Sequence, residues 1–427
     1  MRFDMMPPRT QLAQLMARIY RYGMTTTSGG NISLLDDDGA VWITPAGVDK
    51  GSLRESDIVC IQPDGHIVGA YKPSSEYPFH LAIYRRRPDA RAVLHAHPPA
   101  LVACSIVRCL PCTHIIPQVE YVCGPVGYAP YAQPGTNELG EVIAEAFARG
   151  HHAVVLENHG VVTVGANATQ AFMRFETLDY CARIEQKARA LGGVRALTPA
   201  QVQQLHTTSH FLPEFDPRGH SSHEKEMRAH LCTFIHRAYD QELITSTGGT
   251  FSVRLDSSRF LITPNGLDRK YLEPEDLVLI QDGQRERGKI PSRAVRVHEQ
   301  LYASHPTINA IIIAHPVNIM AFAVSGTPFD TRVIPESYVV LHDVPVVPYG
   351  AQFNDAALVV ATLSPETPVI IVQNDCVITT GENLLQAYDR LEVAEFTANA
   401  IIQARVLGPV QRMSDAQAAA LRAVCEK

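Results

Sequence analysis

The sequence lacks several features that would assign the chain to particular classes of protein. Residues 1–8 contain no apolar run of the kind that forms the core of a secretion signal, so we do not expect export. The most apolar long window, residues 308–326, is interrupted by Asn309, His315, Pro316 and Asn318. These residues make it a poor membrane span and a good buried strand followed by a helix. We therefore expect no membrane partner.

Regularly spaced cysteines and a strong positive charge are also absent. The nine cysteines are odd in number and scattered without the spacing of a secreted disulfide framework, which fits a reducing cytoplasm. The formal net charge of −7 argues against nucleic acid as the main partner. We expect a cytoplasmic protein that acts on something other than nucleic acid or membrane.

The chain does contain an internal repeat. Ser28-Gly29-Gly30 returns as Thr247-Gly248-Gly249, and Thr44-Pro45-Ala46-Gly47 returns as Thr263-Pro264-Asn265-Gly266. Ala96-His97-Pro98 likewise returns as Ala314-His315-Pro316. The chain of 427 residues, long for a single core, is therefore predicted to be a tandem duplication.

The repeat predicts two domains and a fold class. Residues 206–222 have little periodicity and contain Pro213, Pro217 and Gly219, so we interpret them as a linker between domains 1–205 and 223–427. Apolar periodicity predicts helices near residues 10–22, 138–149, 168–191 and 224–239, and strands near 119–122 and 154–156. This mixed order predicts an α/β protein of two α/β/α layered domains, each with a central mixed, largely antiparallel sheet.

Residues 72–98 contain the strongest chemical signal. His95 and His97 lie two apart on a predicted strand, where alternate side chains point to one face, so both imidazoles can approach one point. A catalytic zinc ion usually has three protein ligands. The best candidate for the third is His159 in the Asn158-His159-Gly160 turn. Glu76, at the start of a predicted helix after Ser74 and Ser75, can serve as ligand or base.

The second copy loses most of this constellation while keeping the turns and core strands. At the equivalent positions, Glu76 becomes Ala294, Ser75 becomes Arg293, Asn31 becomes Thr250, His95 becomes Ile313 and His159 becomes Asp375; only His97 is kept, as His315. If the histidines merely packed a core, these changes would not be expected to fall together. We predict that the second copy is degenerate and catalytically inactive.

The ordered set Ser74-Ser75-Glu76, His95-Ala96-His97-Pro98 and Asn158-His159-Gly160 resembles the class II aldolase and adducin N-terminal family, which includes L-fuculose-phosphate aldolase. The resemblance covers both copies and implies the fold of that family. It implies zinc, with manganese, iron or cobalt as alternatives, held by His95, His97 and His159. It also implies Glu76 as the catalytic acid/base and Tyr121 as a proton donor to the leaving aldehyde. The substrate anion would be bound by Gly30, Asn31, Gly47, Ser74 and Ser75.

The function implied is a divalent-metal-dependent lyase. The first expectation is an aldolase that cleaves a small ketose, phosphorylated or not, or a hydroxy-keto acid through a metal-stabilised enediolate or enolate. Decarboxylation or dehydration would use the same electron sink, and a non-enzymatic scaffold of the adducin kind is the alternative of another class. Ala46 stands where the family has a threonine, so a carboxylate is an alternative to a phosphate.

The family's members are typically fourfold tetramers, in which a neighbour completes each site. The resemblance therefore implies a homo-oligomer here. A dimer of tandem chains would place four copies in a ring and mimic that arrangement.

Overall fold

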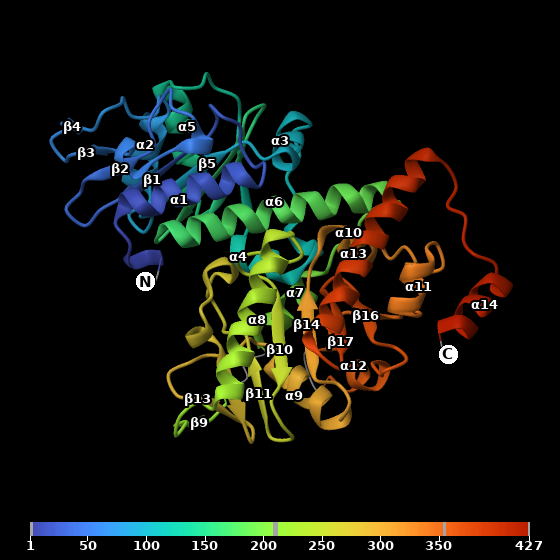
Figure 1. Ribbon diagram of the computed structural model, residues 1–427. Coiled ribbons are helices and arrows are strands. Elements are labelled where there is room, and N and C mark those ends of the chain that lie inside the picture. The colour runs from blue at the N-terminus through green and yellow to red at the C-terminus, as the bar shows by residue number, and fades with distance from the viewer. Residues whose placement is uncertain (1–2, 208–211, 353–355, 426–427) are drawn as a thin grey trace. The chain divides into compact units, whose positions relative to one another are not determined.

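A computed structural model describes residues 3–207, 212–352 and 356–425 of the protein (Figure 1). The chain divides into two compact units. The first contains residues 1–113 and 119–183, and the second contains residues 114–118 and 184–427. No helix among the described residues combines the length and apolarity needed to cross a bilayer.

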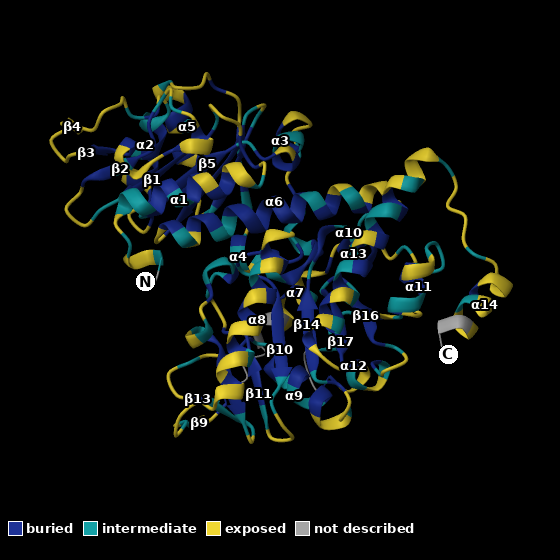
Figure 2. Ribbon diagram, in the orientation of Figure 1, coloured by how far each residue is buried: buried dark blue, intermediate teal, exposed yellow. Residues whose placement is uncertain are grey.

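The first unit is built on an eight-stranded sheet in which only one neighbouring pair, β6 and β7, is parallel. Its strands are short and mostly buried, as Figure 2 shows in dark blue. In spatial order they are β4 (Ile67–Val68), β3 (Val59–Ile61), β2 (Val41–Ile43), β1 (Asn31–Leu35), β5 (Ala92–Ala96), β8 (Gly160–Gly165), β7 (Ala153–Leu156) and β6 (Val126–Ala129).

Helices cover this sheet and close its core. Helix α2 (Tyr77–Arg86) packs on α5 (Asn137–Ala148), and together they bury Val93, Val154 and Val162 of the central strands. The other helices that contribute residues to this unit are α1 (Pro8–Arg21), α3 (Pro99–Ile106), α4 (Pro117–Cys123) and α6 (Ala168–Ala190). Alternation along the strands leaves apolar side chains on both faces of the sheet, which requires helices on both.

The second unit repeats this topology in a nine-stranded sheet. Its strands, in spatial order, are β15 (Val346–Val347), β16 (Val369–Val372), β17 (Cys376–Gly381), β14 (Ala310–Ala314), β10 (Thr250–Arg254), β11 (Arg259–Ile262), β12 (Val278–Gln281), β13 (Gln284–Glu286) and β9 (Glu214–Phe215). Without β9, this is the order of the first sheet, and β15–β16 is parallel as β6–β7 is. The predicted α/β fold with mixed, largely antiparallel sheets is confirmed.

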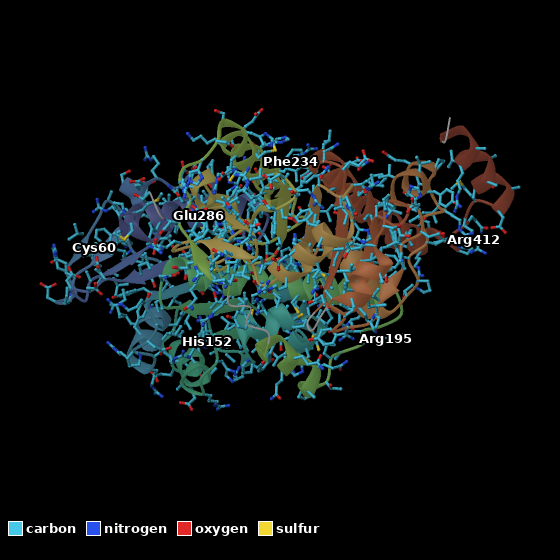
Figure 3. All side chains as sticks on the ribbon, turned by 90° about the horizontal axis from the view of Figure 1, so that it is seen from below. Cys60, His152, Arg195, Phe234, Glu286 and Arg412 are labelled. Carbon is cyan, nitrogen blue, oxygen red and sulfur yellow. The ribbon has the colours of Figure 1, made fainter. Side chains whose placement is uncertain are left out.

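Helices and buried ion pairs complete the second unit. The helices are α7 (Pro199–Thr207), α8 (Ser222–Asp240), α9 (Val295–Ser304), α10 (Val317–Ser325), α11 (Pro335–Leu341), α12 (Ala357–Thr362), α13 (Leu384–Leu407) and α14 (Asp415–Cys425). Arg228 on α8 forms ion pairs with Glu286 on β13 and with Glu224, each at 2.9 Å. Glu286 is labelled in Figure 3. This buried cluster ties α8 to the sheet.

One local expectation differs from the structure. Residues 119–122, expected as a strand, belong to helix α4. Val119 and Cys123, four residues apart, are both buried, and the Gly124 N–H donates to the Glu120 carbonyl as the helix ends. The expected linker, residues 206–222, includes residues 208–211, which lie outside the described residues. Further along it, strand β9 pairs with β13.

Candidate active site

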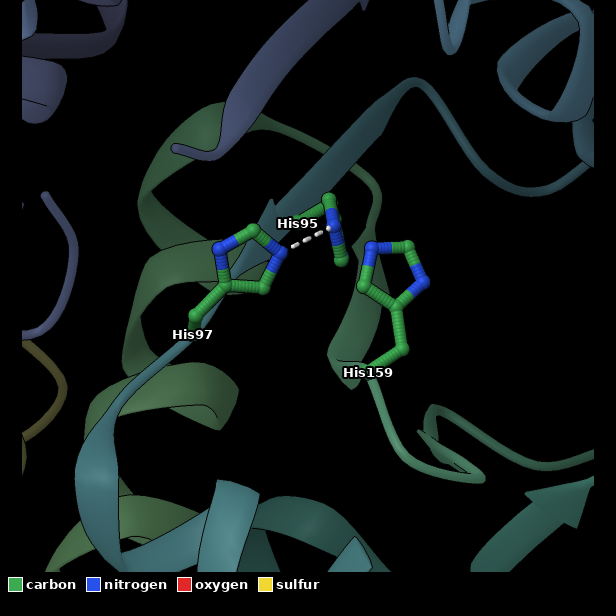
Figure 4. Close-up of side chains that lie close together, drawn as sticks. All are labelled: His95, His97 and His159. Atoms are coloured by element: carbon green, nitrogen blue, oxygen red, sulfur yellow. Dashed lines mark hydrogen bonds between the residues drawn. The ribbon is translucent and has the colours of Figure 1, made fainter. Parts of the chain in front are cut away.

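The three predicted ligands converge in the first unit. His95 lies on β5, His97 follows the end of that strand, and His159 lies in the turn between β7 and β8 (Figure 4). Strands β5 and β8 are antiparallel neighbours, so the end of one strand lies beside the start of the other. One ligand atom from each histidine lies within 4.8 Å of the other two, and no other such group of His, Cys, Asp or Glu occurs in the described part of the chain.

One hydrogen bond orients the central imidazole. His95 Nδ1 donates to the Val161 carbonyl oxygen at 3.0 Å, which leaves its Nε2 lone pair toward the other two rings. The Nε2 atoms of His95 and His97 are 3.0 Å apart, the pair joined by the dashed line in Figure 4. Nitrogen atoms facing one another this closely are suited to share a cation.

Burial keeps these imidazoles neutral. It lowers the pKa of His95 well below its ordinary value, and the neighbouring His97 and His159 lower it further. Burial also lowers the pKa of His97 and of His159, and in both the carboxylate of Glu76 opposes the shift. Neutral imidazoles with free lone pairs are the form that binds a metal ion, so the chemistry of this donor set fits a divalent cation.

Glu76 completes the cluster with a negative charge. It occupies the N-cap of α2, and its Oε2 lies 3.3 Å from His95 Nε2 while its Oε1 lies 3.4 Å from His159 Nε2. Its side chain is 12% exposed, so the carboxylate faces the histidines with limited contact with solvent. Asn31 Nδ2 donates to Glu76 Oε2 at 2.7 Å and fixes that oxygen.

Asn31 is in turn held by a buried chain of side chains. His80 Nε2 lies 2.5 Å from Asn31 Oδ1, and His80 Nδ1 lies 2.7 Å from Ser33 Oγ. Ser33 Oγ lies 2.7 Å from the Tyr84 hydroxyl. Burial lowers the pKa of His80 to about 3, so it is neutral and has one donor and one acceptor nitrogen to serve these two partners.

Two glycines allow the backbone to approach the histidines closely. A Cβ atom on Gly160 would lie 2.6 Å from the Ala96 carbonyl oxygen and 2.6 Å from His97 Cδ2. At Gly30, where φ is +74°, a Cβ would lie 2.9 Å from the His95 carbonyl oxygen. Larger residues at these positions would displace the strand that carries His95.

The predicted anion-binding residues come from neighbouring segments. The Ser74 N–H donates to the Thr44 carbonyl, which places residues 72–74 beside the 44–47 turn. Ser74 is buried, and its hydroxyl accepts from the Glu76 N–H at 3.3 Å. Ser75 and Gly47 are exposed. Asn31, the first residue of β1, donates its amide to Glu76.

A buried lysine in this region was not predicted from the sequence. Lys50, the first residue of the 3-10 helix Lys50–Ser52, is 3% exposed and donates to the Pro45 carbonyl at 2.6 Å. Burial lowers its pKa to about 8. The signal was present in the repeat, because the equivalent residue of the second copy, Arg269, is also a buried cation.

Tyr121 lies on helix α4, and its side chain is 55% exposed. The role expected for it rests on the family resemblance and not on the expected strand. The role of Tyr121 stays a prediction.

At the position of Glu76, the second copy has no carboxylate. Ala294 occupies the N-cap of α9, and Ile313 pairs with Thr250 where His95 pairs with Asn31. Ser252, His298 and Tyr302 repeat the Ser33, His80 and Tyr84 contacts at 2.6 Å each. His298 Nε2, however, has no hydrogen-bond partner among the described residues.

Comparison with known proteins identifies the two halves as copies of one domain. The profile of the "Class II Aldolase and Adducin N-terminal domain" family matches residues 10–186 and 229–402, which is more than half of the chain. The 3-oxo-tetronate 4-phosphate decarboxylase of Pectobacterium atrosepticum is 36% identical over 180 residues, covering 41% of this chain and 82% of that protein.

Two aldolases are similarly related. The L-fuculose phosphate aldolase of Methanococcus vannielii is 36% identical over 157 residues, covering 37% of this chain and 83% of that protein. A solved structure of an L-fuculose 1-phosphate aldolase is 33% identical and covers 46% of this chain and 92% of that chain, with a TM-score of 0.42. Each relative thus spans less than half of this chain.

Proposed function

We propose, because this chain belongs to the class II aldolase and adducin N-terminal domain family, that its first copy is a metal-dependent lyase. Its substrate would be a small compound with a carbonyl and a neighbouring hydroxyl group, from which a carbon–carbon bond is cleaved. The observation that supports this proposal most is the convergence of three neutral imidazoles beside one carboxylate.

His95, His97 and His159 would hold the metal ion. Zinc suits three neutral nitrogen ligands, and manganese, iron and cobalt are alternatives. The ion would supply Lewis-acid stabilisation of the negative charge that develops on a substrate carbonyl oxygen as the bond breaks. The hydrogen bond from His95 Nδ1 to Val161 would orient the central ligand.

Glu76 would move the proton. Its carboxylate is accessible enough to reach a substrate and is held in place by the Asn31 amide. In the cleavage direction it would accept the proton of the substrate hydroxyl whose carbon becomes the aldehyde and return it to the carbon left by the broken bond; in the condensation direction the two transfers would run in reverse. In the condensation direction Tyr121 would pass the proton to the aldehyde's oxygen.

The anionic end of the substrate would bind to Gly30, Asn31, Gly47, Ser74 and Ser75. Lys50 lies beside this turn and adds a buried positive charge. The matched relatives carry names with phosphorylated substrates, which favours a phosphate. Ala46 in place of a hydroxyl residue favours a carboxylate, so compounds with each anion belong in the substrate panel.

A substrate panel tests the reaction. The purified protein would be given phosphorylated ketoses, phosphorylated keto-acids and their unphosphorylated counterparts while aldehyde and carbon dioxide are monitored. Aldehyde release would establish aldol cleavage, and carbon dioxide release would establish decarboxylation, the second candidate, which the decarboxylase relatives favour. Release of neither product by a metal-loaded protein would contradict the proposal.

Replacement of one oxygen tests the role of Glu76. The Glu76→Gln variant should keep its bound metal and lose turnover by about 100-fold or more, because the amide cannot accept the proton. Metal analysis and initial rates would be measured on the same preparation. Full activity would remove Glu76 from the mechanism, and a folded wild-type protein that binds no divalent metal would favour an adducin-like scaffold instead.

We also propose that the second copy, residues 223–427, is catalytically inactive and that residues 1–205 carry the reaction. Ala294 cannot transfer a proton, and His315 and Asp375 are the two potential ligands that remain at the positions of the histidines.

A further inference from the structure

The second unit has a cavity where the first has its catalytic cluster. The cavity volume is about 120 Å³, room for a small molecule of a few heavy atoms. Polar and charged side chains from several elements line it, among them Thr250, Arg269, Ser292, Arg293, His315 and Asp375. All its lining residues belong to the second unit.

One side of the cavity has a buried guanidinium. Arg269 is 4% exposed, and its Nε and Nη1 donate to the carbonyl oxygens of Gly249 and Leu267 at 3.0 and 2.7 Å. Burial lowers its pKa to about 10, so it remains charged at neutral pH, and Asp268 partly opposes the shift. A buried cation bonded to neutral carbonyls is costly, and an anion in the cavity would offset that cost.

A second guanidinium lines the same cavity. Arg293 Nη2 donates to Gln118 Oε1 at 3.1 Å, and Gln118 Nε2 donates to the Thr247 carbonyl at 3.0 Å. This amide helps to orient the arginine. The charge of Arg293 also lowers the pKa of both His315 and Asp375, which places it close to them.

Asp375, the acidic side chain in the lining, balances at most one of the two guanidinium charges. Burial raises the pKa of Asp375 to about 6, and its carboxylate is hydrogen-bonded by Gln352. Burial lowers the pKa of His315 to about 4, so that imidazole is neutral near pH 7. With two permanent cations and one weakly acidic carboxyl group, the cavity has a net positive charge.

Hydroxyl groups stand beside the arginines. Thr250 Oγ1 and Ser292 Oγ lie 2.7 Å apart and can each donate to an incoming oxygen after rotating. In the first copy the equivalents of Thr250 and Arg293 are Asn31 and Ser75. The second copy has therefore lost Glu76 and two imidazoles and gained Asp375 and Arg293. The number of carboxylates is unchanged and one guanidinium is added, a change toward binding negative charge.

We propose that this cavity is a metal-independent binding site for a small anion that carries a phosphate or a carboxylate group. The guanidinium groups of Arg269 and Arg293 bind the anion, and the hydroxyls of Thr250 and Ser292 donate to its oxygens. The site is separate from the metal cluster of the first copy and does not depend on the proposed lyase activity.

Hydrogen exchange of the full chain locates such binding. Inorganic phosphate and glycolate are the two probes, used in the presence of a chelator and compared with chloride. We expect slower amide exchange in residues 246–250 and 291–294 with at least one probe. Protection by phosphate alone, or by glycolate alone, would identify the preferred anion. Protection by neither, or protection confined to residues 44–50 and 72–76 of the first copy, would overturn the proposal.

Arg293→Ser, which installs the residue found at Ser75, tests the cation directly. Loss of one charge-assisted hydrogen-bonding group should weaken binding by about 10- to 100-fold in calorimetric titration. Arg296→Ser is the matched control, because Arg296 lies three residues further along, in the first turn of α9, and pairs with Glu299; this variant should leave affinity unchanged. Arg293→Lys keeps the charge and should cause a smaller loss.

Replacing Arg293 by serine and, separately, by lysine guards the test against the misfolding of either variant. If Arg293→Ser does not fold, Arg293→Lys provides the measurement. Wild-type affinity in whichever of them folds would contradict the proposal. Metal content of the first copy, measured on the same samples, should be unchanged, so a failure here is distinguishable from a failure of the proposed lyase function.

Discussion

Glu76 is oriented by a line of buried side chains that ends at Tyr84, and His80 is its central member. His80→Leu keeps a similar volume but removes both hydrogen bonds of the ring. Asn31 then loses its support, and the carboxylate it holds becomes free to turn. We expect turnover to fall by about 10- to 100-fold, the range typical when a supporting partner of a reactive group is lost, with metal content unchanged.

The repeat supplies the control for this prediction. His298→Leu removes the equivalent imidazole, which makes the same serine contact at 2.6 Å in the second copy, where Ala294 stands at the position of Glu76. Both variants should lower the thermal midpoint, and only His80→Leu should lower the rate. Equal rates in the two variants would show that His80 packs the core without affecting Glu76.

The buried imidazole of His298 also makes the stability of the fold depend on pH. Burial lowers its pKa from 6.5 to about 3. Between these values the unfolded chain binds a proton that the folded chain excludes, so the free energy of unfolding falls as pH drops below 6.5. One such group contributes at most about 1.4 kcal/mol per pH unit. Urea midpoints should therefore fall between pH 7 and pH 5, and less steeply in His298→Leu; equal slopes would refute the assignment.

The residues of the cluster could be predicted from the sequence, but their supports could not. His95, His97 and His159 come together because strand alternation and a turn place them, and both leave a local pattern. The link from His80 to Asn31 crosses 49 positions and depends on the placement of α2 against β1. Lys50 has no local motif, and only its repetition as Arg269 marks it.

At the scale of elements, β5 and β14 are the same strand with different chemistry. His95 pairs with Asn31 and Val162, and Ile313 pairs with Thr250 and Ile378. An isoleucine is thus compatible with this position of the sheet.

This comparison predicts the effect of His95→Ile. The variant should remain folded, with a metal-free stability within about 1 kcal/mol of the wild type, because a buried imidazole is exchanged for an apolar side chain of similar size. Bound metal should fall to background, because two imidazoles remain. Circular dichroism melts and metal analysis check both. Retention of stoichiometric metal would show that His95 is not a ligand.

Helix α4 shows where the sequence misleads. Val119 and Val122 favour a strand by composition, and the segment is too short for a clear helical period. The structure forms a helix because Pro117 can begin one and because Val119 and Cys123 are buried together. The long helices α1, α5, α6 and α8 were predicted to within a few residues, since several turns of apolar periodicity leave little ambiguity.

At the scale of the whole molecule, the two copies differ in apolar exposure at the end of α3 and of its equivalent, α10. At the end of α3, Ile106 is 58% exposed and the following Val107 is 68% exposed. The residue equivalent to Ile106 in the second copy, Val324, is fully buried. Two neighbouring apolar side chains exposed at the end of α3 form a surface suited to contact another protein.

We predict that this surface contributes to self-association of the chain. A dimer of tandem chains would contain four copies of the domain, and its mass would be about 94 kDa, twice the 46.9 kDa of one chain. Replacing Ile106 and Val107 together by lysine would place two charges in a desolvated contact and should shift sedimentation toward the mass of one chain. Lysine at Leu385 and Phe396, which are 59% and 61% exposed on α13, is the matched control and should not. A wild-type protein that sediments as a fully active monomer would rule out the dimer.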